Sequence, residues 1–89
     1  MTTYGWYWLS FCDADRPAGQ QFLGACVIRA ASHEAAVLTA HALGCNPGGE
    51  VMIQGPSFRD FAPEWTGRLL TREECEAFER AYGAEGAPS

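Results

Sequence analysis

Residues 4–12, YGWYWLSFC, constrain the fold most strongly, because nearly every position carries a ring or another apolar side chain. Aromatic side chains favour the pleated surface of a β-strand, and the segment shows little helical period. Alternation along a strand then separates two sets of side chains: Tyr7, Leu9 and Phe11 on one face, and Trp6 and Trp8 on the other. The sequence therefore predicts a strand with large apolar groups on both faces.

A second strand is expected over residues 21–30, QFLGACVIRA, which are rich in apolar and β-branched side chains. A stretch of turn-forming residues precedes it, so the two strands are expected to form an antiparallel hairpin. Gly24 has no side chain to pack inside this strand. We expect a ring from the neighbouring strand, Trp6 or Trp8, to cover it.

An alanine-rich helix is expected next, within residues 31–44. Ser32 suits the N-cap and Gly44 suits the C-cap, and the many alanines predict close packing on a sheet. On a helical wheel the apolar arc also includes Leu38 and Leu43. A tight turn at Pro47–Gly48 then leads into a third strand, VMIQ.

The next segment, residues 55–70, has two prolines and no sustained period, and we interpret it as an ordered arm. It carries five large apolar side chains: Phe58, Phe61, Trp65, Leu69 and Leu70. A solvated linker would not hold so many apolar groups, so the arm is expected to lie across a sheet face or edge, with a short strand near residues 68–70. The tryptophan face is then either a second small core closed by Phe58, Phe61 and Trp65, or a patch that binds a partner. We favour the core for at least one of the two tryptophans and expect the other to be a contact residue.

A second helix is predicted to begin at Thr71, because Thr71 and Glu74 have the spacing of a capping box. Cys75, Phe78 and Tyr82 then follow as one apolar stripe. Together these elements predict a single α+β domain over residues 1–83, with the order β-β-α-β-arm-α. The sheet should have three to four mainly antiparallel strands with a helix packed on one face. Residues 84–89 are expected to form a flexible tail.

Composition and charge exclude several classes of protein. Apolar residues make up 47% of the chain and charged residues 19%, which is typical of a globular domain. No apolar run approaches the roughly 20 residues of a membrane helix, and MTTYGWYW lacks the features of a signal peptide, so we expect a cytoplasmic protein without membrane contact. With a net charge of -5, six arginines and no lysine, direct nucleic-acid binding is not expected.

The candidate catalytic residues are His41 and Cys45, which are four positions apart, so an imidazole and a thiol could meet. With Glu50 and an aromatic pocket they would support an alternative function, a small enzyme or ligand-binding domain. The pair His33 and His41 does not fit the zinc-protease pattern, because eight residues of helix separate them by about 12 Å. We therefore expect no metal site and no cofactor.

Residues 43–51, LGCNPGGEV, follow the alanine-rich helix and precede the third strand. This segment resembles a helix-turn-strand pattern in small uncharacterised proteins of bacteria and their phages. The pattern is structural, consisting of a helix stop and a turn. The resemblance therefore carries over no catalytic or binding residue.

The leading functional hypothesis is a small acidic protein-binding module, such as a phage or mobile-element accessory or inhibitor that binds a host protein. The chain has no convincing catalytic constellation, more aromatic area than a three-stranded sheet easily hides, and an acidic final helix. The candidate binding residues are Trp6, Trp8, Trp65, Glu73, Glu76 and Glu79. A homodimer through an exposed sheet edge is a further possibility.

The glutamates of the last helix also have a simpler interpretation, a solvated helix face with internal ion pairs. Glu76 and Arg80 are four positions apart in the favourable order, so they are expected to pair.

Overall fold

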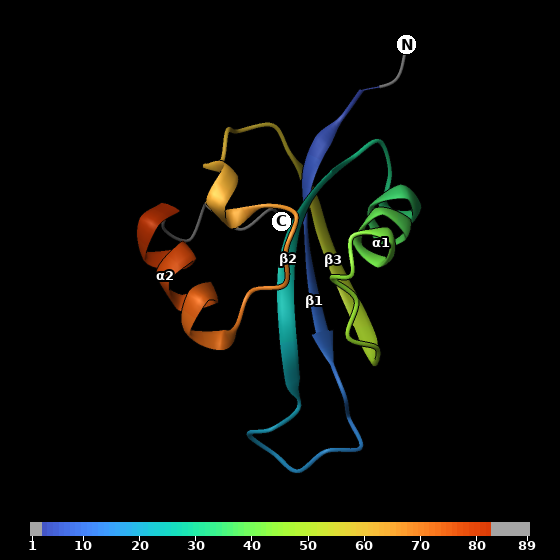
Figure 1. Cartoon of the computed structure of the whole chain (residues 1–89), viewed down its shortest axis with the longest axis vertical. Helices are drawn as coiled ribbons and strands as arrows, with labels where there is room; N and C mark the ends of the chain where they lie inside the picture. The colour runs from blue at the N-terminus through green and yellow to red at the C-terminus, as the bar shows by residue number, and fades with distance from the viewer. Residues whose placement is uncertain (1–2, 83–89) are drawn as a thin grey trace.

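The computed structural model describes residues 3–82 of the chain. Its elements follow the predicted order: β1 (Gly5–Cys12), β2 (Phe22–Ala30), α1 (His33–Ala42), β3 (Glu50–Ser57), the short 3-10 helix η1 (Pro63–Trp65) and α2 (Arg72–Tyr82). The helices α1 and α2 lie on opposite sides of the sheet (Figure 1). The predicted α+β fold is confirmed, while the expected domain boundary at residue 83 and the tail over 84–89 lie outside the described residues.

The sheet has three strands in the order β2-β1-β3, and both pairings are antiparallel. The aromatic strand β1 is therefore the central strand, with Leu9 aligned between Cys26 of β2 and Ile53 of β3. Because both neighbours run antiparallel to β1, they run parallel to each other. The helix α1 makes the connection between them.

The outer edge of β2 is paired with the arm. The amide of Leu70 donates to the carbonyl of Ala25 at 2.6 Å, and the amide of Ala25 donates to Leu70 at 3.2 Å. The amide of Gly67 adds a third bond, to Val27, at 3.0 Å. The arm therefore lies along the sheet edge as expected, but its pairing is an isolated bridge at Leu70 and not the short strand expected near residues 68–70. Within residues 3–82, the outer edge of β3 has no strand partner.

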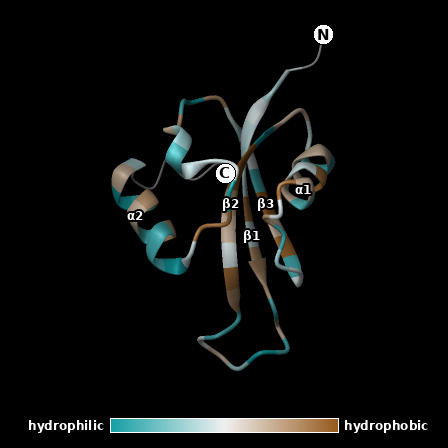
Figure 2. Cartoon of the chain, in the orientation of Figure 1, coloured by the Kyte–Doolittle hydropathy of each residue, from teal (hydrophilic) through white to brown (hydrophobic). Residues whose placement is uncertain are grey.

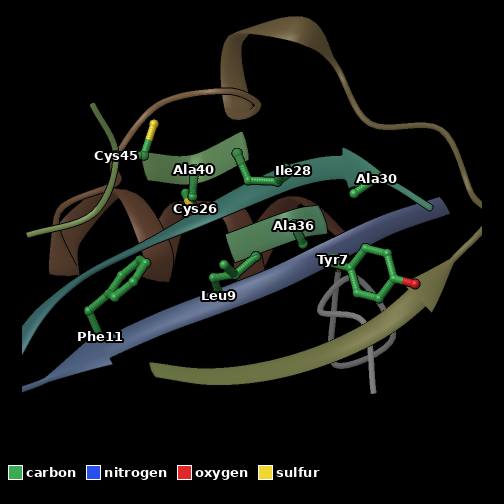
Figure 3. Close-up of a cluster of buried hydrophobic side chains, with 9 residues drawn as sticks. All are labelled: Tyr7, Leu9, Phe11, Cys26, Ile28, Ala30, Ala36, Ala40 and Cys45. Atoms are coloured by element: carbon green, nitrogen blue, oxygen red, sulfur yellow. The ribbon is translucent and has the colours of Figure 1, made fainter. Parts of the chain in front are cut away.

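A first core lies between the sheet and α1 (Figure 3). It contains the predicted set from β1, namely Tyr7, Leu9 and Phe11, all of which are buried. Ala36 and Ala40 are fully buried on the helix side, and their small side chains allow the close approach to the sheet that the sequence predicted. The alternation along β1 therefore assigned this face correctly.

The ends of α1 also follow the sequence. The hydroxyl of Ser32 accepts a hydrogen bond from the amide of Ala35 at 3.1 Å. At the other end Gly44 has a φ of 75°, and the amide of Cys45 donates to the carbonyl of Ala40 at 2.8 Å, as in a Schellman motif. The helical wheel was wrong for Leu38 and Leu43, which are 70% and 55% exposed, because α1 contacts the sheet through its alanines.

A second core lies on the opposite face of the sheet, under α2 and η1. Its members are Trp6, Trp8, Val27, Phe61, Trp65, Phe78 and Tyr82. Phe61 and Trp65 of the arm cover the tryptophans as expected, but Phe58 does not, since it is 67% exposed. The expectation that a tryptophan covers Gly24 was also wrong. A Cβ at Gly24 would approach Leu69 of the arm to 2.8 Å, so the arm fills that space.

Candidate functional site

The candidate site is the surface formed by α2, whose ribbon carries hydrophilic stretches in Figure 2. The predicted capping box fixes the N-terminal end of α2. The hydroxyl of Thr71 accepts from the amide of Glu74, and the carboxylate of Glu74 accepts from the amide of Thr71, both at 3.2 Å. Arg68 of the arm forms an ion pair with the same carboxylate. The Thr71 amide, followed by Arg68, lowers the pKa of the Glu74 carboxyl.

The helix is attached to the sheet through Phe78, which is 1% exposed. Its ring lies 5.3 Å from Trp8, 5.8 Å from Trp65 and 4.8 Å from Tyr82, measured between ring centroids. The Tyr82 hydroxyl also accepts a hydrogen bond from the amide of Ala62 in the arm, at 2.9 Å. These contacts fix the rotation of α2, so its glutamates are held at defined positions beside the aromatic core.

Two hollows of about 330 Å³ each lie beside α2. The Trp65 hollow is lined by Glu64, Trp65, Arg68, Glu73, Glu74 and Ala77. The Trp8 pocket is lined by Trp8, Phe22, Arg72, Cys75, Glu76, Phe78 and Glu79. Each therefore combines an aromatic wall with carboxylates from the helix.

The structure brings together most of the candidate binding residues, in two groups. Trp8, Glu76 and Glu79 line the Trp8 pocket, while Trp65 and Glu73 line the Trp65 hollow. Trp6 is separate from both groups. It lines a third, smaller hollow of about 220 Å³ whose other residues include Leu43, the C-cap of α1. The two tryptophans of β1 are both half-buried, so each contributes to the core and to a surface hollow.

The predicted ion pair between Glu76 and Arg80 is not formed. Within residues 3–82 the ion pairs are Arg16–Asp13 and Arg68–Glu74. No arginine of this part of the chain therefore lies within 4 Å of the carboxylates of Glu76 or Glu79. Within residues 3–82 the carboxylates of Glu76 and Glu79 are therefore in no ion pair.

The sequence assigned no role to Phe22 or Arg72, yet both line the Trp8 pocket, and the guanidinium carbon of Arg72 lies 5.4 Å from the Phe22 ring centroid.

An irregularity in β2 explains the position of Phe22. The register of β1 against β2 shifts between Phe11 and Cys12, so one residue of β2 is left without a partner. In a regular strand, side chains an even number of residues apart share a face of the sheet, so Phe22 would lie under α1 together with Cys26. The irregularity, which includes Gly24 at a φ of 137°, turns Phe22 toward α2 instead. A glycine inside a strand was the available signal.

The candidate catalytic pair does not form a hydrogen-bonded unit. Cys45 is 2% exposed, and its thiol donates to the carbonyl of Gly67 at 3.3 Å. Burial raises the pKa of this thiol, which favours the protonated form. His41 is exposed on α1, and no hydrogen bond joins it to Cys45. The exposed Glu50 lines none of the three hollows.

The other histidine has a structural contact. The ring of His33 packs edge-on against Tyr7, with centroids 5.2 Å apart, and its Nε2 lies 3.3 Å from the carbonyl oxygen of Gly55 in β3. Within residues 3–82, no group of three metal-ligating side chains is close enough to hold an ion. In the same range, no helix has the length and apolarity needed to span a bilayer.

Comparisons of the chain with protein-family models, with curated proteins and with solved structures find no match.

Proposed function

We propose that the chain is a protein-binding module whose contact surface is α2 with the two hollows beside it. The observation that carries this proposal is the grouping of five candidate binding side chains around one helix: Trp8, Glu76 and Glu79 on one side, and Trp65 and Glu73 on the other. Aromatic anchors in hollows with a polar, charged rim around them are typical of protein interfaces.

The charge of α2 supports a partner with a basic contact surface. The helix carries four glutamates and two arginines, and the whole chain has a net charge of -5. Complementary charge increases the rate of association and selects among partners more than it increases affinity. We therefore propose a cytoplasmic protein partner. The proposed role is that of a phage or mobile-element accessory that inhibits a host protein by covering part of its surface, with α2 as the covering element.

A crosslinking experiment tests the surface. A photoreactive amino acid replaces Glu76 on α2 or, as the matched control, the exposed Glu34 on α1. We expect a specific crosslinked protein from position 76 only. The purified partner should then bind the parent chain and Glu34→Gln equally well. It should bind more weakly to the triple variant Glu73→Gln, Glu76→Gln, Glu79→Gln. Equal crosslinking from both positions, or equal binding of the two variants, would contradict the proposal.

A separate observation favours self-association as a second candidate. The edge of β3 is open within residues 3–82, and Met52 on this strand is 64% exposed. Two copies could pair these edges in antiparallel orientation. Light scattering should then find a dimer for the parent chain and a monomer for Met52→Lys. The control Leu38→Lys, which changes a position of similar exposure on α1, should remain a dimer. A parent chain that stays monomeric at every concentration would exclude pairing through β3.

A further inference from the structure

The Trp8 pocket has the size and composition of a site for one side chain. Its volume of about 330 Å³ is at the lower end of the range of roughly 300–1,000 Å³ that small-molecule sites occupy. Its lining includes three aromatic residues, Trp8 of β1, Phe22 of β2 and Phe78 of α2. A site of this size accommodates a single projecting group of a larger partner.

The aromatic wall of this pocket is fixed before any partner arrives. The rings of Trp8 and Phe78 lie 5.3 Å apart at an interplanar angle of 31°. Phe78 is fully enclosed, whereas Trp8 is only half-buried and therefore presents part of its ring to the pocket. A ring held in this way loses little conformational entropy when a ligand stacks on it.

Carboxylates outnumber cationic groups among the side chains that line the pocket. Glu76 and Glu79 contribute two carboxylates against the single guanidinium of Arg72, and neither carboxylate has an arginine within 4 Å in residues 3–82. Arg72 already lies over the ring of Phe22, which leaves the ring of Trp8 for another group. An anion would meet an excess of carboxylates. A purely apolar group would cover the carboxylates without pairing them.

We propose that the Trp8 pocket binds an arginine side chain of the protein partner, an inference that depends on the proposed binding function. The flat guanidinium of arginine can stack on an indole ring and donate to a carboxylate in a bidentate manner, whereas a lysine ammonium is a compact, strongly hydrated charge. The stack on Trp8 would supply contact area, and Glu76 and Glu79 would supply the directional hydrogen bonds.

The test titrates a short peptide, acetyl-Gly-Arg-Gly-amide, to about 20 mM, into protein labelled with ¹⁵N, a range suited to a Kd near 1 mM. The same peptide with citrulline, which keeps the shape but removes the charge, is the control ligand. We expect saturable shifts of the Trp8 indole N–H and of residues 75–79 with arginine alone. The variant Glu76→Gln, Glu79→Gln should weaken binding at least about threefold, whereas Glu34→Gln should leave it unchanged. Both positions of the double variant are exposed, so the spectrum should otherwise stay that of the parent fold.

Equal shifts with arginine and citrulline, shifts away from the pocket, or no shifts would overturn this proposal. Its failure is distinguishable from failure of the proposed function. If position 76 crosslinks a partner that binds without any arginine requirement, the binding function stands and the pocket assignment fails. If the arginine peptide binds but no partner is crosslinked, the pocket assignment stands and the wider function fails.

Discussion

Leu23 and Cys26 are three positions apart in β2, yet both side chains pack in the core under α1. In a regular strand such residues face opposite sides of the sheet. The register shift between Phe11 and Cys12 resolves the difference, because one extra residue in β2 reverses the alternation. Phe22 consequently reaches the Trp8 pocket on the other side of the sheet.

The first prediction concerns the glycine at this irregularity. Gly24→Ala should destabilise the protein by about 1–3 kcal/mol, because the residue has a φ of 137° and the new Cβ would collide with Leu69. The control is Gly19→Ala, where φ is 85° but no atom lies within 4 Å of the added carbon. Urea denaturation should show the larger loss for Gly24→Ala. Equal losses would mean that the contact with the arm adds nothing.

The second prediction compares two phenylalanines. Phe78→Ala should lower the free energy of unfolding by about 3–5 kcal/mol, because it removes a fully buried ring that packs against Trp8, Trp65 and Tyr82. Phe58→Ala should change it by less than about 0.5 kcal/mol, since Phe58 is 67% exposed. Denaturant titrations measure both values. A large loss for Phe58→Ala would restore the role that the sequence predicted for it in the second core.

The third prediction concerns pH. The Thr71 amide, followed by Arg68, holds the pKa of the Glu74 carboxyl below its ordinary 4.5. The ionised form therefore favours the folded state above that value, and the contribution is lost as the pH falls through the lower pKa of the folded chain. Glu74→Gln should lower Tm at neutral pH, and the difference from the parent protein should shrink below pH 4.5.

Glu73→Gln is the control for this measurement, because the neighbouring Glu73 carboxylate makes no hydrogen bond or ion pair within residues 3–82. Its effect on Tm should be smaller at neutral pH. A Glu74→Gln difference that persists unchanged in acid would contradict the charge argument.

The fourth prediction concerns the four cysteines and a thiol-labelling reagent at neutral pH. Cys12 should react fastest, since it is partly exposed, whereas burial, with Glu74 and Glu76 nearby, raises the pKa of Cys75 to about 11. Burial, with Cys45 and Cys75 nearby, raises the pKa of Cys26 to about 12. Cys26 and the buried Cys45 should react only when the fold opens.

His41→Ala tests the alternative enzymatic function in the same assay. The labelling rate of Cys45 should not change, because no hydrogen bond joins the thiol to His41 in the structure. A Cys45 that is labelled rapidly and slows down in the variant would favour the histidine-activated nucleophile instead.

The features that the sequence predicted well depend on local rules. The alternation of Tyr7, Leu9 and Phe11 follows from the pleat of one strand, and the capping box of Thr71 and Glu74 follows from four consecutive residues. Their geometry does not require knowledge of the rest of the chain.

The features that the sequence missed depend on long-range contacts. The arm has no period that could tell the exposed Phe58 from the buried Phe61. The position of Phe22 depends on an inserted residue whose site is decided by pairing with a distant strand. The Trp8 pocket was therefore found only in part, through Trp8 and the glutamates of α2.

The placement of the rings on the two faces of β1 gives the protein its own optical reporter. All three tryptophans of the chain belong to the core under α2, and none belongs to the core under α1. Tryptophan emission should therefore follow the detachment of α2 selectively. Events confined to the α1 layer should leave the emission nearly constant, so unlabelled protein can be used to follow one half of the molecule alone.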